Sequence, residues 1–276
     1  MVRSFQCNVV RTQEAEATVV KAPMIVLKTS REIDTMREAN RIVAEILERL
    51  AEMVKPGATT GELDKVAEAM ILQAKAKAAF KGYQMRNNKP YPAVICSSVN
   101  EEIVHGIPGP RVLKEGDIVG VDVGVIYKGF VGDAARTYPV GEVSPAALKL
   151  LNVTRESLYE GIQKAVAGNR LQDISGAIQQ HVESHGFSVV RDFVGHGIGR
   201  KMHEPPQIPN YKGGGWNPRL QVGMALALEP MVNEGTWKIK LLDDEWTAVT
   251  ADGKLSAHFE HSIAITDNGP MILSET

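Results

Sequence analysis

The chain has 276 residues, of which 43% are hydrophobic and 23% charged, and its formal net charge is −2. A chain of this size and composition can bury a sizeable core. Its near-neutral charge gives no electrostatic basis for nucleic acid or an anionic membrane as a partner, and no apolar run approaches the roughly 18 residues that span a bilayer. The two cysteines, Cys7 and Cys96, form no paired motif, so we expect a reducing compartment, the cytoplasm.

The N-terminal residues 1–23 show no sustained hydrophobic period and are predicted to be a loose leader without a zinc motif. The remainder, 24–276, is predicted to be one domain. The apolar run MIVLKT, which starts at Met24, predicts a short strand. Translation starting at Met24 instead of Met1 is also compatible with this pattern.

Four helices follow from apolar periodicity and capping signals. Thr29 and Glu32 match a capping box, and apolar residues then recur at steps of three and four until Lys55-Pro56-Gly57 ends the helix. The other three helices are predicted over 59–79, 145–167 and 171–184.

Strands are predicted over 92–104 and 117–140, the second range being a hairpin that turns at Lys128-Gly129. In that hairpin residue i pairs with residue 257 − i, so Asp133 lies opposite Gly124. Asp133 then shares a face with Asp122, because alternate residues of a strand point the same way. The alternative is that both aspartates lie on a solvated face.

An internal repeat is indicated by residues 54–66 and 165–177, which are similar at an offset of 111 positions. Each half, about 29–140 and 145–265, runs helix, helix, strands. If this similarity is not due to chance, the halves form one pseudo-symmetric α+β domain with a ligand site between them.

Five residues in separate strand-like segments carry the most informative chemistry. A buried carboxylate without a partner is costly, so such groups are usually paired or bind metal. A single oxygen-rich metal site with one imidazole explains all five together, whereas separate salt bridges and an isolated core histidine remain the alternatives for each alone. The residues are Asp122, Asp133, His196, Glu229 and Glu260.

The order and spacing of the surrounding motifs resemble the bacterial type I methionine aminopeptidase family. The motifs are HGIP, VDVGV, GDAARTYPVG, GHGIGR, HEPP, LEPMV and FEHS, with KPGATTGELD upstream. The resemblance runs from Met24 to the end. It implies a pita-bread fold, which is α+β and pseudo-two-fold symmetric with a central antiparallel sheet covered by helices, and one catalytic domain over 24–276.

The resemblance also implies the metal chemistry. Asp122, Asp133, His196, Glu229 and Glu260 match the family's ligands for two divalent ions, with Asp133 and Glu260 bridging and Asp122 bidentate. Four carboxylates balance two such ions, and an oxygen-dominated set suits Mn or Fe first, with Co or Zn possible. A monovalent cation is implied near Asn100, Glu102 and Ser256.

The implied reaction is removal of the N-terminal methionine from nascent polypeptides, with preference for a small second residue. His105 and His203 match the catalytic histidines that contact the substrate, and Glu229 is expected to move the proton of the attacking water. Substrate-pocket positions fall on Tyr83, Tyr91, Cys96, Met202 and Trp246. Met202 replaces a frequent phenylalanine, and the segment 84–90 is longer than usual. Ribosome association is plausible, and a monomer is the default.

Three alternatives differ from this interpretation. An Xaa-Pro peptidase of the same fold usually has a large extra N-terminal domain. A type II enzyme usually has a helical insertion between the residues matching His203 and Glu229, which are 26 positions apart here. A pita-bread binding module that has lost catalysis is disfavoured because none of the seven metal and histidine positions is substituted.

Overall fold

The computed structural model describes residues 24–84, 89–213 and 215–275. The predicted leader, 1–23, and part of the long segment 84–90 therefore lie outside the described residues. Within them, no helix is both long and apolar enough to cross a membrane.

The first helix pair begins as the capping signals predict. Helix α1 (Ser30–Met53) starts with a capping box in which the Glu32 N–H donates to Thr29 Oγ1 and the Glu32 carboxylate accepts the Thr29 N–H. Helix α2 (Thr60–Gln73) starts with the same motif. The predicted extension of this second helix to residue 79 is wrong. Lys75 has a φ of 56°, which ends the helical path, and Lys77–Ala78 then form strand β1.

The predicted hairpin is confirmed in position and register. Strands β4 (Ile118–Tyr127) and β5 (Phe130–Pro139) pair without interruption, and Gly124 lies opposite Asp133. Lys128 and Gly129 at the turn have φ values of 48° and 79°, as a tight hairpin turn of this hand requires.

This hairpin is part of an antiparallel sheet of nine described strands, whose main path runs β1-β4-β5-β14-β9-β7-β8. Strand β2 pairs with β4, and β15 pairs with β14. The further members are β2 (Ile95–Val99), β7 (Gly195–Gly197), β8 (Glu204–Ile208), β9 (Ala225–Leu228), β14 (Glu260–Thr266) and β15 (Gly269–Ile272).

Two smaller sheets flank the central one. In the first, β10 (Met231–Asn233) lies between β6 (Ser188–Val189) and β13 (Ser256–His258). In the second, β12 (Ala248–Thr250) lies between β3 (Glu102–Val104) and β11 (Ile239–Leu241).

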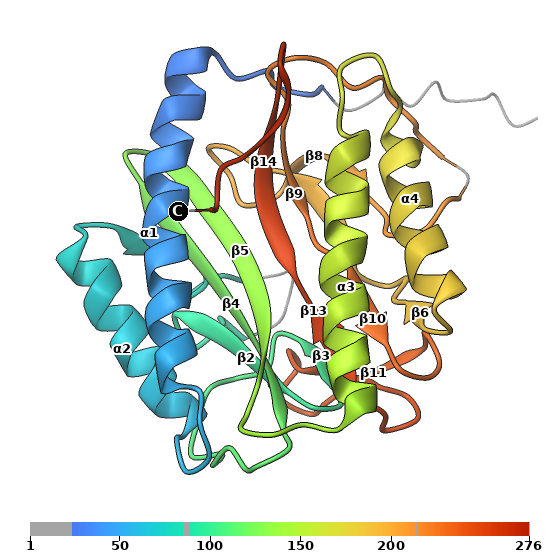
Figure 1. Ribbon diagram of the computed structural model, residues 1–276. Coiled ribbons are helices and arrows are strands. Elements are labelled where there is room, and N and C mark those ends of the chain that lie inside the picture. The colour runs from blue at the N-terminus through green and yellow to red at the C-terminus, as the bar shows by residue number, and fades with distance from the viewer. Residues whose placement is uncertain (1–23, 85–88, 214, 276) are drawn as a thin grey trace, which may run out of the picture.

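The second helix pair consists of α3 (Pro145–Lys164) and α4 (Leu171–Ser184). Figure 1 shows both pairs on the same side of the curved sheet, with α1 in front of β4 and β5 and with α3 beside β9, β13 and β14. A buried apolar cluster lies under each pair, so the helices hold the sheet from its outer face.

Equivalent contacts at the turn of each helix pair give the fold its pseudo-two-fold symmetry. The Gly57 N–H donates to the Leu113 carbonyl, and the Gly168 N–H, 111 positions later, donates to the Leu220 carbonyl. Thr59 and Arg170, separated by the same interval, each form a bridge to a later strand-like segment. The predicted α+β pita-bread architecture is therefore confirmed.

The strand predicted at Met24 is not formed, since residues 24–29 have neither helical nor strand structure. Met24, Val26 and Leu27 are 81%, 51% and 46% exposed, so this run has no buried apolar face to hold it in a sheet. It is attached through the Lys28 N–H, which donates to the Gly223 carbonyl at 2.7 Å.

Candidate metal centre

A cavity of about 270 Å³ opens on the inner side of the central sheet. Its lining contains every site residue that the sequence predicts. These are Tyr83, Tyr91, Cys96, His105, Asp122, Asp133, His196, Met202, His203, Glu229, Trp246 and Glu260.

The five metal-ligand candidates come from neighbouring strands. Asp122 and Asp133 lie on β4 and β5, Glu260 opens β14, Glu229 directly follows β9, and His196 is in β7. In the sheet these strands are consecutive, in the order β4-β5-β14-β9-β7. Residues far apart in the chain therefore reach one place because the sheet orders the strands differently from the sequence.

Helix α1 positions Asp133 through its backbone. The buried Asn40 donates from Nδ2 to the Met36 carbonyl and accepts the Asp133 N–H on Oδ1 at 3.1 Å. On the other side, Ser262 Oγ donates to the Asp133 carbonyl at 2.8 Å. The backbone at Asp133 is thus held from a helix and from β14, which leaves its carboxylate free to face the cavity.

His196 presents Nε2 to the carboxylates. Its Nδ1 lies 3.0 Å from the Gly197 carbonyl, which only accepts, so Nδ1 carries the proton. Nε2 lies 3.4 Å from Glu229 Oε1 and 3.9 Å from Asp133 Oδ2. This tautomer is typical of imidazoles that bind a metal through Nε2.

Asp133, His196 and Glu260 form the tightest group, in which one ligand atom of each lies within 4.8 Å of the other two. All three are buried. Asp122 and Glu229 lie outside this group, although Glu229 reaches His196 as given above. The Asn210 amide holds Glu229 by donating to its backbone carbonyl at 2.9 Å.

The carboxylates repel one another and are poorly solvated. Burial raises the pKa of Asp122 to about 7. Burial, and then the charge of neighbouring carboxylates, raises the pKa of Asp133, Glu229 and Glu260 well above the ordinary range. A cation among them would reverse these shifts.

Three carboxylate oxygens also lack a hydrogen-bond partner within the described part of the chain, and they are Asp122 Oδ1, Asp133 Oδ1 and Glu260 Oε1. Buried oxygens are rarely left in this state. Burial lowers the pKa of His196 to about 3, so its imidazole is neutral and able to donate a lone pair. These residues therefore fit a site for divalent cations.

The two candidate catalytic histidines line the same cavity and have different neighbours. Tyr83 Oη and His203 Nδ1 are 2.7 Å apart, and the ring centroids of His203 and His196 are 4.4 Å apart. His105 packs edge-on against Phe193, at 5.3 Å between centroids. Burial lowers the pKa of His203 and lowers that of His105 to about 4, so both rings are neutral near pH 7.

The apolar wall combines Tyr91, Cys96 and Trp246 with Phe80, Tyr83 and Ile107. The Tyr91 hydroxyl points away from the open space, because it donates to the backbone carbonyls of Ile95 and Gly106. Its ring meets that of Trp246 edge-on at 5.2 Å. Tyr91 thus fixes the chain next to His105 and offers the cavity only its ring.

His258 is the main site residue that sequence reasoning missed. It lines the cavity, and its Nε2 lies 3.8 Å from Glu229 Oε2. No sequence signal marked it, because its approach to Glu229 depends on the pairing of β13 with β10. Other lining residues not predicted are Phe80, Val104, Asp192, Phe193, Val194, Gln207 and Met231.

The residues predicted near a monovalent cation are only partly together. The Ser256 N–H donates to the Asn100 carbonyl at 2.9 Å. The Glu102 carboxylate instead accepts the Val99 N–H and pairs with Arg111 at 2.6 Å. The cation itself stays a prediction.

Comparison with known proteins identifies the relatives of this chain. The model of metallopeptidase family M24 matches residues 34–267. A methionine aminopeptidase of Clostridium perfringens is 55% identical over 91% of this chain and 99% of its own length. The crystal structure of the methionine aminopeptidase from Thermotoga maritima has a TM-score of 0.88 and 48% identity, and covers 92% of this chain and 100% of that one.

A Xaa-Pro dipeptidase from Bacillus anthracis shares the fold, with a TM-score of 0.70 and 22% identity. This chain spans 62% of that protein. The resemblance to methionine aminopeptidases that the sequence motifs indicate is confirmed.

Proposed function

Because this chain belongs to metallopeptidase family M24, we propose that it removes the N-terminal methionine from nascent polypeptides, with two divalent ions in the cavity. The observation that carries the proposal is the convergence of four carboxylates and one imidazole beside a largely apolar wall. The high identity to proteins named methionine aminopeptidase supports the substrate.

In this proposal the residues that would hold the ions are Asp122, Asp133, His196, Glu229 and Glu260. Oxygen-rich sites of this kind favour Mn or Fe. When bound, divalent ions lower the pKa of water to near neutrality and polarise a carbonyl group.

Glu229 is the residue that moves the proton. Its carboxylate lies near His196 through Oε1 and near His258 through Oε2. Like Asp122, it lies outside the tight group of three. We assign it to accept a proton from the attacking water and to pass that proton to the leaving nitrogen.

His203 and His105 orient the substrate. The Tyr83 hydroxyl holds His203 at Nδ1, so its Nε2 is available to donate to the scissile carbonyl oxygen. His105 would contact the amide nitrogen of the same bond.

The wall formed by Tyr91, Cys96 and Trp246 receives the methionine side chain, since a thioether makes favourable contacts with aromatic rings. Burial raises the pKa of the Cys96 thiol well above its ordinary value, so Cys96 acts as a wall residue and not as a nucleophile. The limited cavity favours a small second residue.

Peptide hydrolysis tests the proposal. We expect the protein to hydrolyse Met-Ala-Ser but not Ala-Pro-Ser, to lose this activity with a chelator and to regain it with Mn(II). Cleavage of Ala-Pro-Ser instead would assign an Xaa-Pro peptidase. Cleavage of neither peptide after metal addition would indicate a binding module.

A further inference from the structure

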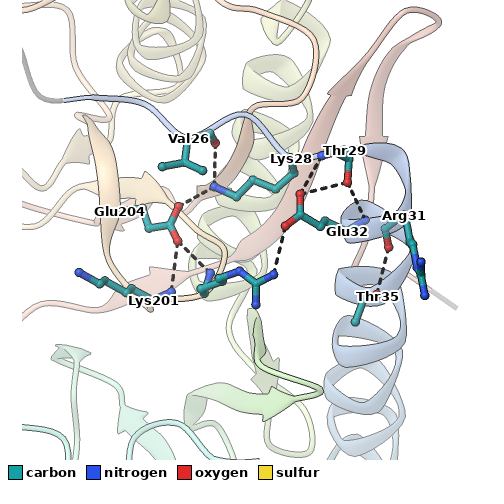
Figure 2. A network of polar contacts seen from close by, with 9 residues as sticks. Val26, Lys28, Thr29, Arg31, Glu32, Thr35, Lys201 and Glu204 are labelled. Atoms are coloured by element: carbon teal, nitrogen blue, oxygen red, sulfur yellow. Dashed lines mark hydrogen bonds and ion pairs between the residues drawn. The ribbon is translucent and has the colours of Figure 1, made fainter.

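The loop between β7 and β8 carries His203 and is built around one buried carboxylate. Figure 2 shows the carboxylate of Glu204, the residue next to His203 and the first of β8, in contact with Lys28 and with the loop backbone at Lys201. Its Oε1 accepts the Arg200 N–H at 2.8 Å and the Lys201 N–H at 3.2 Å. A single side chain thereby folds residues 200–204 back on themselves.

Lys28 holds that carboxylate from a distant part of the chain. Its Nζ lies 2.5 Å from Glu204 Oε2 and also donates to the Val26 carbonyl at 2.9 Å. The two side chains are only 5% and 11% exposed. A pair buried to this degree is strongly destabilised when one partner is removed, because the other charge remains without compensation.

The backbone at Gly199 packs closely against the Lys28–Glu204 pair. A Cβ on Gly199 would lie 2.5 Å from Lys28 Cε and 2.7 Å from Glu204 Oε1. Only glycine fits such a close approach. The neighbouring Arg200–Glu32 pair is different, because the Arg200 side chain is 63% exposed and an exposed pair contributes little.

His203 is thus held at two places. The Tyr83 hydroxyl contacts its ring at 2.7 Å, and the Glu204–Lys28 pair holds the loop that carries it, through the N–H groups of Arg200 and Lys201. Lys28 does not line the cavity, so any effect of Lys28 on the reaction has to pass through the loop.

We propose that Lys28 is a positioning residue that, through Glu204, keeps the His203 ring in its working place. The segment 24–29 therefore acts as a support for the active site. This inference rests on the role of His203 in the proposed function.

The test is a double-mutant cycle with Lys28→Met and His203→Ala on a Met-Ala-Ser substrate. Displacing a catalytic group by a fraction of an ångström to one ångström costs roughly ten- to a hundredfold. We expect Lys28→Met to lower kcat about tenfold with little change in KM. In the His203→Ala background the same change should have no further effect, because coupled residues are not additive.

A second readout does not need activity. In metal-free protein, the ¹⁵N NMR signals of the His203 ring, assigned by their loss in His203→Ala, should shift in Lys28→Met and return in Lys28→Arg. Arg41→Met is the matched control, since Arg41 forms an exposed pair with Glu45 at 2.8 Å on α1. It should leave both kcat and the ring signals unchanged.

Unchanged His203 signals in Lys28→Met would overturn the inference, and so would an equal loss of kcat in both backgrounds. If Lys28→Met does not fold, Lys28→Met/Glu204→Gln takes its place, because the amide leaves no unpaired buried charge. Absence of activity in the unaltered protein would count against the proposed function alone, since the NMR signals still report on Lys28.

Discussion

At the scale of single residues, motif spacing identified the ligand candidates and the two histidines, because each lies in a segment with its own sequence signature. It did not identify His258, whose Nε2 lies 3.8 Å from Glu229 Oε2. That contact depends on how β10 pairs with β13, with Met231 opposite His258. A pairing between distant strands leaves no mark in either segment alone.

Glu229 is the residue where the proposed mechanism is most directly tested. Glu229→Gln keeps the size of the side chain but cannot accept the proton, so we expect kcat to fall by about 10²–10⁴-fold with the fold preserved. Steady-state kinetics at matched metal content measure this. The control is Glu234→Gln, a nearby change outside the cavity lining. Near-normal turnover in Glu229→Gln would contradict the proposed mechanism.

At the scale of elements, the sequence predicted the hairpin, α1 and α4 well because capping, periodicity and turn signals agree there. The second helix was predicted too long, since Ala74, Ala76 and Ala78 fit a helix as well as a strand edge. The pairing of β1 with β4, which is a tertiary contact, makes residues 77–78 a strand. The contact of α1 with β5 through Asn40 was likewise not readable from either segment.

The α1–β5 contact makes a prediction for Gly132. A Cβ at this position would lie 2.7 Å from the Ala39 carbonyl carbon and 2.8 Å from the Asn40 nitrogen, both backbone atoms. We expect Gly132→Ala to lower the free energy of unfolding by about 1–3 kcal/mol, measured by urea denaturation. Gly109→Ala is the control, because no atom lies within 4 Å of its added Cβ. Equal stability of the two variants would contradict this packing.

At the scale of the whole molecule, metal binding and stability are linked through the buried charges. The pKa values of the four carboxyls are raised in the folded state, so without metal the folded protein keeps protons that the unfolded chain releases. The stability of the folded protein therefore falls as pH rises above the unfolded carboxyl pKa. The contribution of Asp122 to this fall continues until the pH passes its folded pKa of about 7. The pKa values of His105 and His196, lowered to about 4 and 3, act oppositely, and this effect fades as pH rises through the unfolded histidine pKa of about 6.5.

Above pH 6.5 the carboxyl effect, carried by four groups, thus outweighs the fading histidine effect. We expect the metal-free protein to be less stable at pH 8 than at pH 6.5 by about 1 kcal/mol or more. Mn(II) should remove this loss, because it binds the ionised carboxylates of the folded state only. Urea denaturation at the two pH values, with chelator and with Mn(II), measures both effects. An identical unfolding midpoint with and without Mn(II) at pH 8 would contradict a cation site here.

Strands β5 and β14 are joined by two residue pairs, Glu260 with Ala135 and His261 with Ala134. Asp133 stands on one side of this short seam, and His196, Glu229 and Glu260 stand on the other. An ion held by residues of both strands would link them across this short contact. The ion of the proposed reaction would then also join one half of the sheet to the other.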